Sequence, residues 1–584
     1  MATETLKQQI STRFPEIASD TQLLTECVSV CQNYSLTAEE LQYKWEAHNF
    51  RPSATRSEIS PYTLESLGTL KAEIQRQRTA KAGVQKAAPR TSLVASINRG
   101  AFRNRNPVAK AANASVHVKL EPTADGFGME GIAGPSTVTF KGPSNDASAR
   151  KKRAYRYMHE KPSERGDVLD DRINEFAERI REHYDLADLG DPSSSTPEDV
   201  TVVGRIIQDD EAVEESAKLA DGAISLECSR ALGNGARVPL RFDWNLKIRG
   251  AAQGSGSTAF FPGAITALRG KNGGGGYFQV SEILTLPPLM PSASRVKPDT
   301  EDSAFSMFIA SGPYTPDQDL GFKPWRALVK KIQEAKPAVV LLLGPFIDAL
   351  HPLIKSGDVD STPLNLFRTR FTDPLRSYLD SVPGSIALIV PSVRDLVGDH
   401  AVFPQCELPA DVARGDPRIH LLPNPAWFTL NGITFAATSA DVLFHIRKGE
   451  FVKRGEEVEP TPPMSAEDTG SDPMANVCRH LLHQRSFYPV FPVPLELASE
   501  VVLDVSHSEG LRMGGGEGGD APECAPDVLI VPSRLKQFTK TVYATAALNP
   551  SFVSKNSYVV LDVSAPDGSG AKPRLSPRVV KLEL

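Results

Sequence analysis

Four short segments, which we call corners because each follows the end of a predicted strand, stand where the sequence could place catalytic groups. Each follows an apolar run typical of a buried strand, and they read "SGPY" (311–314), "GPFID" (344–348), "PSVRD" (391–395) and "PSRL" (532–535). In open α/β sheets, functional groups lie at the carboxyl ends of strands. Carboxylates and imidazoles at such corners would hold two metal ions about 3.5–4 Å apart and activate water for hydrolysis.

The four corners resemble the motifs of the calcineurin-like metallophosphoesterases, which read Asp-x-His, Gly-Asp, Gly-Asn-His-Asp/Glu and Gly-His-x-His. The resemblance lies in strand order and corner position, whereas the ligands are missing. The matching ligand positions hold Gly312, Tyr314, Pro345, Val393, Arg394, Ser533 and Leu535. Glycine, proline, valine and leucine supply no ligand atom, and the arginine would repel a cation. The sequence therefore predicts an inactive site with no metal and no cofactor.

Other candidate sites are weaker. His480 and His483 stand at i,i+3 on a predicted helix, but no carboxylate or cysteine at matching spacing completes a zinc site. A solvent-facing or interface helix is therefore favoured. Asp348 and Asp395 lie near the position of the phosphoesterase metal site and could each be a remaining metal ligand. A role in capping a helix or in pairing with Arg394 is favoured for them. "GGGGY" (273–277) lacks the Gly-Lys-Ser/Thr ending of a phosphate loop.

The composition limits the class of protein to which these corners can belong. A chain of 584 residues, 40% hydrophobic and 23% charged, suits a soluble protein of two to four domains. It contains no apolar run long enough for a membrane span and no visible secretory signal. The six scattered cysteines support neither a zinc module nor a disulfide framework and indicate a reducing compartment. A net charge of −6 argues against coating of nucleic acid by bulk electrostatics.

The N-terminal quarter divides into a small domain and a tether. Residues 1–78 are predicted to form a helical domain, in which Thr37 and Glu40 have capping-box spacing and Leu41, Trp45 and Phe50 form a core-facing stripe. Residues 79–150, rich in Ala, Gly, Ser, Pro and Arg, are predicted to be a flexible, disordered linker. A short basic cluster at its end could be a nuclear import signal or a solvated linker end: Arg150, Lys151, Lys152 and Arg153.

Two further segments precede the corners. Residues 151–195 form a helical segment, whose apolar stripe is Leu169, Ile173, Phe176, Ile180 and Tyr184. Residues 196–300 contain five short β-rich runs separated by turns, which predicts a barrel of OB type. Such barrels often bind single strands through aromatic platforms and a basic groove. Because these strands offer few exposed aromatic–basic combinations, a structural, protein-binding barrel is favoured.

Residues 301–584 alternate strands and helices and predict a two-layer or sandwiched α/β domain. "WFTLNGITFAATSADVLFHI" (427–446) is interpreted as a hairpin turning at Asn431-Gly432, and the segments 455–472 and 508–526 as surface insertions. The fold class is therefore multidomain α+β: a helical N-terminal domain, a disordered tether, an OB-type β-barrel and an α/β calcineurin-like phosphoesterase-like domain.

This order of domains resembles the B subunits of eukaryotic replicative DNA polymerases, and within them the polymerase alpha–primase branch. The resemblance rests on "ASGPYT", "PAVVLLLGPFIDALH", "VPSVRD", "LNGITFAATSADVLFHI", "LLHQRSFYPVFP" and "PDVLIVPSRLKQF", which span most of residues 303–550. The N-terminal helices fit the alpha branch better than the delta or epsilon branches.

The resemblance implies a non-catalytic subunit that holds the zinc-bearing C-terminal domain of the catalytic subunit of DNA polymerase alpha. It also implies primase within the complex, other replication factors at the N-terminal domain, mostly indirect contact with DNA, no membrane, and a nuclear location. The aromatic segment 485–492 is a candidate partner-binding or inter-domain surface through Arg485, Phe487, Tyr488 and Phe491. A core-packing role for it stays open. The alternatives are an active metallophosphoesterase or 3′–5′ exonuclease, one of the delta or epsilon B subunits, and a single-strand-binding barrel.

Overall fold

A computed structural model gives the architecture of the chain. It describes parts of residues 6–71, and then residues 138–208 without 145, 222–292, 304–514, 524–564 and 575–583. Two compact units are present, Met1–Ala124 and Asp125–Leu584. Most of the predicted linker, residues 79–137, lies outside the described residues.

The first unit contains a helical core, as predicted. Helix α2 (Thr21–Tyr34) buries Cys27 and Cys31, which stand at i,i+4 and therefore share one face. Leu41 and Trp45 are fully buried in the same cluster. Phe50, however, is not on their helix, because it begins β1 (Phe50–Ser53), which pairs with β2 (Arg56–Ile59). Glu40 lies outside the described residues.

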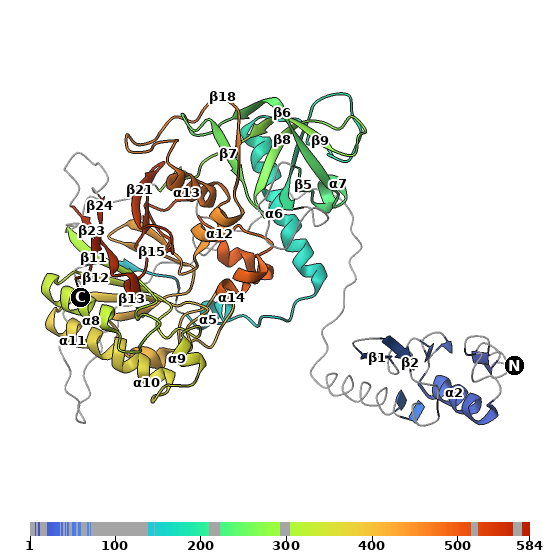
Figure 1. Cartoon of the computed structure of the whole chain (residues 1–584), viewed down its shortest axis with the longest axis horizontal. Helices are drawn as coiled ribbons and strands as arrows, with labels where there is room; N and C mark the ends of the chain where they lie inside the picture. Colours follow the sequence, from blue (N-terminus) through green and yellow to red (C-terminus); the bar gives the residue numbers. More distant parts are fainter. Residues whose placement is uncertain are drawn as a thin grey trace, which may run out of the picture. The chain divides into compact units, whose positions relative to one another are not determined.

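The second unit contains a five-stranded closed barrel, which lies within the predicted range 196–300 (Figure 1). The strands are β4 (Val200–Gln208), β5 (Ile224–Glu227), β6 (Arg237–Arg249), β8 (Ile265–Lys271) and β9 (Phe278–Leu284). Neighbours pair in the antiparallel order β6-β5-β4-β8-β9, and a parallel contact between β6 and β9 closes the barrel. Short α7 (Arg230–Gly233) connects β5 to β6.

Helix α6 (Pro162–His183) runs along one side of the barrel (Figure 1). It begins seven residues before the predicted stripe, because Pro162 at its first turn suits a helix start. Ile173, Phe176 and Ile180 are buried against Val203, Ala267 and other barrel residues, as the 4-3-4 spacing predicts.

The phosphoesterase-like domain is built on two six-stranded sheets. The first has the order β14-β13-β12-β11-β23-β24, and its four first strands are parallel. Their bounds are β11 (Phe305–Ser311), β12 (Val339–Leu343), β13 (Ile386–Val390), β14 (Ile419–Leu421), β23 (Ser557–Val563) and β24 (Leu575–Lys581). Helices on its outer face bury a large aromatic cluster: α8 (Lys323–Ala335), α9 (Pro352–Lys355), α10 (Pro363–Phe367) and α11 (Asp373–Ser381).

The second sheet packs on the first through an apolar layer that includes Met307, Leu341, Phe428 and Val528. Its order is β21-β22-β20-β16-β15-β3. The bounds are β3 (Phe140–Lys141), β15 (Ala426–Leu430), β16 (Ile433–Ala437), β20 (Val528–Ile530), β21 (Phe538–Val542) and β22 (Thr545–Asn549). This is the sandwiched α/β domain that the alternation of elements predicts.

The outer face of the second sheet shares one hydrophobic core with the barrel. Helices α12 (Val442–Gly449) and α13 (Pro473–His483) lie in that core, together with barrel residues such as Leu240 and Phe278. The predicted hairpin at 427–446 is therefore correct only through Ala437, since its last residues form α12. A continuous core makes the barrel and the α/β domain one packed body.

Two segments predicted to be peripheral are instead part of this body. The end of the predicted linker is ordered: β3 pairs with Thr429 and Leu430, and α5 (Ala147–Arg153) follows. The predicted insertion at 455–472 begins with β18 (Glu456–Val458), which pairs in parallel with β6 of the barrel. Just before it, β17 (Phe451–Arg454) pairs with β7 (Ser257–Phe260). Tertiary pairing stabilises strands that are too short and polar to show a period of their own.

Among the helices that the structure describes, none combines the length and the apolar character needed to cross a bilayer.

Candidate functional site

The first corner is closed by its neighbour, without room for a ligand. A Cβ atom on Gly312 would lie 1.9 Å from the carbonyl oxygen of Pro345, so an aspartate cannot occupy this position without moving the second corner. Strand pairing sets this approach, because the Gly312 amide donates to Leu343 O at 2.8 Å. The first two corners are thus in backbone contact where the resemblance would place metal ligands.

Tyr314 fills the position of a histidine ligand with a buried ring. Its side chain is fully buried, and its hydroxyl donates to Leu343 O at 2.9 Å. The ring stacks on Phe346 at 5.3 Å and contacts Trp325 and Phe371 edge-on. Burial raises the pKa of the Tyr314 hydroxyl well above its usual value, so it stays protonated and does not act as an anionic ligand.

The second and third corners are joined by an ion pair. Arg394 donates from Nε to Asp348 Oδ1 at 3.0 Å and from its terminal nitrogen to Oδ2. The backbone of the two corners is also paired, since Ala349 N donates to Arg394 O at 2.8 Å. The prediction that Asp348 pairs with Arg394 is confirmed. A guanidinium thus occupies the space beside the carboxylate that a cation would need.

Asp395 holds the same two corners through backbone amides. Its side chain is 6% exposed and accepts from Ser392 N at 2.8 Å, from Ile347 N at 3.2 Å and from Phe346 N. Burial raises the pKa of Asp395 to about 7, although these three amides oppose that shift. The predicted capping role is therefore correct in kind, but the cap serves the turns at 344–347 and 391–395 rather than a helix.

The fourth corner carries a second network of charges. Arg534 donates to Asp441 from its backbone amide and from Nε, both at 2.9 Å, and pairs with Glu500. Asp441 caps α12 by accepting from Phe444 N. His445 and Arg534 lower the pKa of Glu500 to about 2. All of these charges are satisfied within the chain.

The remaining ligand positions of the third and fourth corners are apolar or buried. Val393 and Leu535 are half-buried against the shared core, and Ser533 is fully buried with its amide donating to Asn549 Oδ1 at 2.9 Å. The fourth corner also approaches the first, because Lys555 Nζ donates to Arg534 O while Ser554 N donates to Pro313 O. The structure therefore brings the four predicted corners together, and their residues do not fit a pair of metal ions.

Comparison with known proteins identifies the family. Residues 307–540 match the family of DNA polymerase alpha/epsilon B subunits, and residues 166–286 match the OB domain of DNA polymerase alpha B subunits. The chain is 30% identical over 586 residues to the DNA polymerase alpha B subunit from Schizosaccharomyces pombe, with 92% of each chain covered. The chain belongs to the family of DNA polymerase alpha B subunits.

More distant members of this family agree with the assignment. The Saccharomyces cerevisiae relative is 28% identical over 467 residues, covering 71% of this chain and 61% of the relative. The Bos taurus relative is 27% identical over 488 residues, covering 82% and 73%. A solved structure from Thermus thermophilus aligns with 44% of this chain and 95% of its own at 12% identity, and its TM-score of 0.21 carries no argument.

The aromatic segment that the sequence offers as a partner surface of this polymerase alpha B-subunit family member is mostly internal. Phe487 and Tyr488 are 2% and 3% exposed in the shared core, so of the alternatives predicted for them the structure supports the inter-domain and core-packing role. Phe491 is half-buried beneath Arg205 of the barrel, with 5.4 Å between guanidinium and ring. The Arg485 carbonyl accepts a hydrogen bond from Met513 N. After α13 the chain turns back between the barrel and the second sheet, which buries these side chains as an inter-domain seam.

The two histidines of α13 contact different groups and do not form a ligand pair. His483 shares a hydrogen bond of 2.7 Å with the Tyr543 hydroxyl, and burial lowers its pKa to about 3. His480 packs edge-on against Phe261 of the barrel and lies 3.6 Å from Glu450. Of the two favoured interpretations of this helix, solvent-facing or interface, the structure supports the second, because α13 packs in the core between the barrel and the second sheet.

The basic cluster at the end of the predicted linker lies on α5. Arg153 pairs with Glu407 at 3.0 Å and Arg150 reaches the same carboxylate at 3.6 Å, whereas Lys151 and Lys152 are exposed. Of the four residues of the predicted import signal, Lys151 and Lys152 are therefore the two that are exposed and make no ion pair with Glu407.

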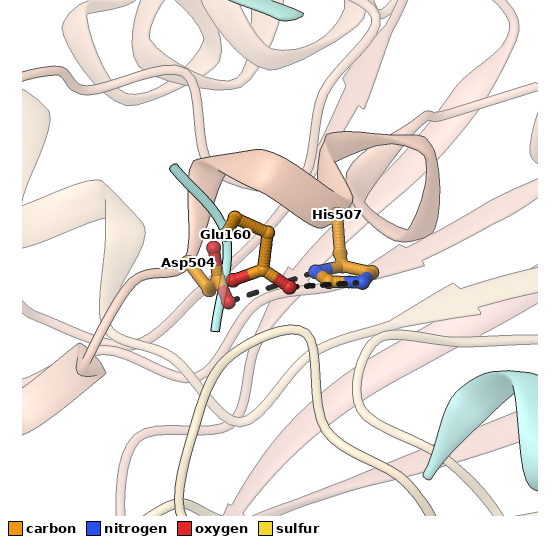
Figure 2. A group of neighbouring side chains, drawn as sticks. All are labelled: Glu160, Asp504 and His507. Carbon is orange, nitrogen blue, oxygen red and sulfur yellow. Dashed lines mark ion pairs between the residues drawn. The ribbon is translucent and has the colours of Figure 1, made fainter. Parts of the chain in front are cut away.

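One cluster of carboxylates and imidazole escaped prediction from the sequence. Among the described residues, Glu160, Asp504 and His507 offer ligand atoms within 4.8 Å of one another (Figure 2). Glu160 faces Nε2 of His507 at 3.8 Å, whereas Asp504 faces Nδ1 at 3.6 Å. The two acids face opposite nitrogens of one ring, so they do not converge on a single nitrogen as the ligands of one ion would. Asp504 and His507 stand at i,i+3, but Glu160 lies far away in the chain, and no sequence pattern links it to them.

Proposed function

We propose that this chain is a non-catalytic subunit of the DNA polymerase alpha–primase complex. It binds the C-terminal, zinc-bearing domain of the catalytic subunit and acts as a scaffold during primer synthesis. One observation carries the non-catalytic part: the four corners are filled by backbone contacts, a buried tyrosine and ion pairs of the chain itself. Two-metal hydrolysis has no ligands to work with there.

The scaffold role is supported by the family and by the packing of the second unit. The barrel and the α/β domain share one hydrophobic core, and β18 pairs with barrel strand β6, while β17 pairs with β7, which lies between β6 and β8 in the chain. A preorganised body of this kind lowers the ordering cost of binding a partner. The N-terminal unit, in this proposal, recruits other replication factors, and the complex works in the nucleus.

Co-expression with the C-terminal domain of a polymerase alpha catalytic subunit tests the proposal. We expect one species in size-exclusion chromatography with light scattering, at the mass of a 1:1 complex. Separate elution of two folded proteins, verified by circular dichroism of each, would refute the proposed partner. Nuclear import is tested apart from this: a Lys151→Ala/Lys152→Ala double variant should shift a fluorescent fusion toward the cytoplasm, and unchanged localisation would remove these lysines as the signal.

A further inference from the structure

One outer face of the barrel carries four exposed basic side chains in two cross-strand rows. Arg241, Gln279 and Lys271 are register partners across β6, β9 and β8, and residues paired across strands project to the same face. Lys247 and Arg269 form the next row, on either side of Glu282. The four basic residues are exposed. This local excess of positive charge stands against a chain whose net charge is −6.

The acids near these rows are engaged. The buried Glu282 pairs with Arg249 at 2.7 Å, so its charge is balanced by a residue outside the two rows. Asp243 accepts from the Gln279 amide and keeps its charge, which leaves four basic side chains against one carboxylate on this face.

Trp244 projects from β6 between the two rows. Its side chain is 97% exposed, and it lies in the irregular stretch where the register of β6 with β9 shifts between Phe242 and Lys247. Bulges of this kind redirect side chains out of the usual alternation. At about 3.3 Å per residue, Trp244 stands about 10 Å along the strand from both Arg241 and Lys247.

A second aromatic ring accompanies the cations. Tyr277 follows the glycine turn between β8 and β9, and the Arg241 guanidinium lies 4.0 Å from its ring centroid. The neighbouring Phe242 instead packs against the hydrophobic core and stacks on Phe260 at 5.5 Å, so it does not belong to this face. The aromatic groups beside the basic rows are therefore Trp244 and Tyr277.

Helix α6 covers the adjoining part of the outer surface, where Ala267 and Leu284 are buried. Trp244 and the two basic rows lie beyond that cover, and no element within the described ranges buries the tryptophan. A ligand that covers the Trp244 ring removes apolar surface from water, and this contributes favourably to binding.

We propose that this face, formed by Arg241, Trp244, Lys271 and Tyr277 with Lys247 and Arg269, binds single-stranded nucleic acid. Bases stack on Trp244 and Tyr277, and phosphates lie against the arginine and lysine rows. In barrels of this topology, the second and third strands and the turn between the fourth and fifth bind oligonucleotides. Here β6 is the third strand and the turn before Tyr277 joins the fourth to the fifth. Two separate rings among cations, on the face that oligonucleotide-binding barrels use, fit successive bases and their phosphates.

Binding of a fluorescein-labelled oligo(dT) of about 20 nucleotides to the full-length chain tests this proposal by anisotropy over a range of salt. The variants are Trp244→Ala, Trp244→Phe and the double change Arg241→Ala/Lys271→Ala. The matched control is Arg326→Ala/Lys330→Ala on α8, which removes two exposed charges from the α/β domain. Circular dichroism of each variant separates loss of binding from loss of folding.

We expect Trp244→Ala to weaken binding by about 5- to 150-fold, the range that loss of one stacked base supports, and Trp244→Phe to keep most of the affinity. Removing Arg241 and Lys271 should reduce the slope of log affinity against log salt by about 1.4. The control should match the unaltered chain. No binding by the unaltered chain at 50 mM salt, or equal binding by all variants, would overturn the proposal. So would a loss of binding to the polymerase chain in Trp244→Ala without loss of oligonucleotide binding, which would make this face a protein contact.

Discussion

A single methyl group at Gly312 tests whether the corners are closed. The Cβ of Gly312→Ala would lie 1.9 Å from Pro345 O and 2.9 Å from Pro345 N, so the neighbour is backbone rather than a mobile side chain. Ordinary contact begins at 3.4 Å, and Pro345 must therefore retreat by about 1.5 Å (3.4 − 1.9). That retreat would move Phe346, which is 2% exposed, off the Tyr314 ring and off Asp395.

We expect this change to lower the free energy of unfolding of the second unit by about 3–5 kcal/mol, at the upper end for overpacking. Urea titration followed by tryptophan emission measures it, because buried Trp325 lies 5.4 Å from Tyr314. Gly273→Ala is the matched control: a Cβ there meets nothing within 4 Å, and its effect should stay within about 0.5 kcal/mol. A loss below 1 kcal/mol for Gly312→Ala would refute the closed corner.

Three further predictions concern the same region and its support. Tyr314→Phe should cost about 0.5–1.5 kcal/mol in the same urea titration, because one hydrogen bond to Leu343 O is lost while the Gly312 amide still donates to that oxygen; an unchanged midpoint would contradict this. Arg394→Ala should lower the free energy of unfolding by about 3 kcal/mol, because it leaves the carboxylate of Asp348, which is only 9% exposed, without its partner. A double-mutant cycle with Asp348→Asn should give a coupling of about 1–3 kcal/mol rather than zero. The lowered pKa of His483 means that its neutral ring stabilises the fold above pH 6.5, and that this stability is lost as pH falls from 6.5 toward 3. Unfolding at pH 5 should therefore need about 1–2 kcal/mol less than at pH 7.5, and His483→Gln should reduce that difference.

The apolar runs made much of the α/β domain predictable. Runs such as 339–343 and 386–390 are buried on both faces, and a continuous apolar sequence of that length is typical of a central parallel strand. The absence of metal ligands at the corners could also be predicted, because the side chains of Gly312 and Pro345 have no atom that binds a metal. The groups that fill the corners were harder to predict from the sequence. The pairing of Arg394 with Asp348 was the exception, because it followed from opposite charges at neighbouring corners.

Features that depend on distant contacts could not be predicted. Phe487 and Tyr488 look like an exposed aromatic motif, and only the seam between barrel and sheet makes them core. The strands at 451–454 and 456–458 are polar and short, and they exist because β7 and β6 lie beside them. Trp244 is exposed by a shift of register that no local pattern of alternation marks.

Phosphodiesterase activity in the presence of Mn²⁺ tests most directly the central claim that this fold has no hydrolytic site. The full-length chain is incubated with bis-p-nitrophenyl phosphate and with single-stranded DNA, beside an Asp348→Ala variant purified identically. The account predicts no turnover above the protein-free blank for either protein. Mn²⁺-dependent turnover by the unaltered chain that disappears in Asp348→Ala would contradict it.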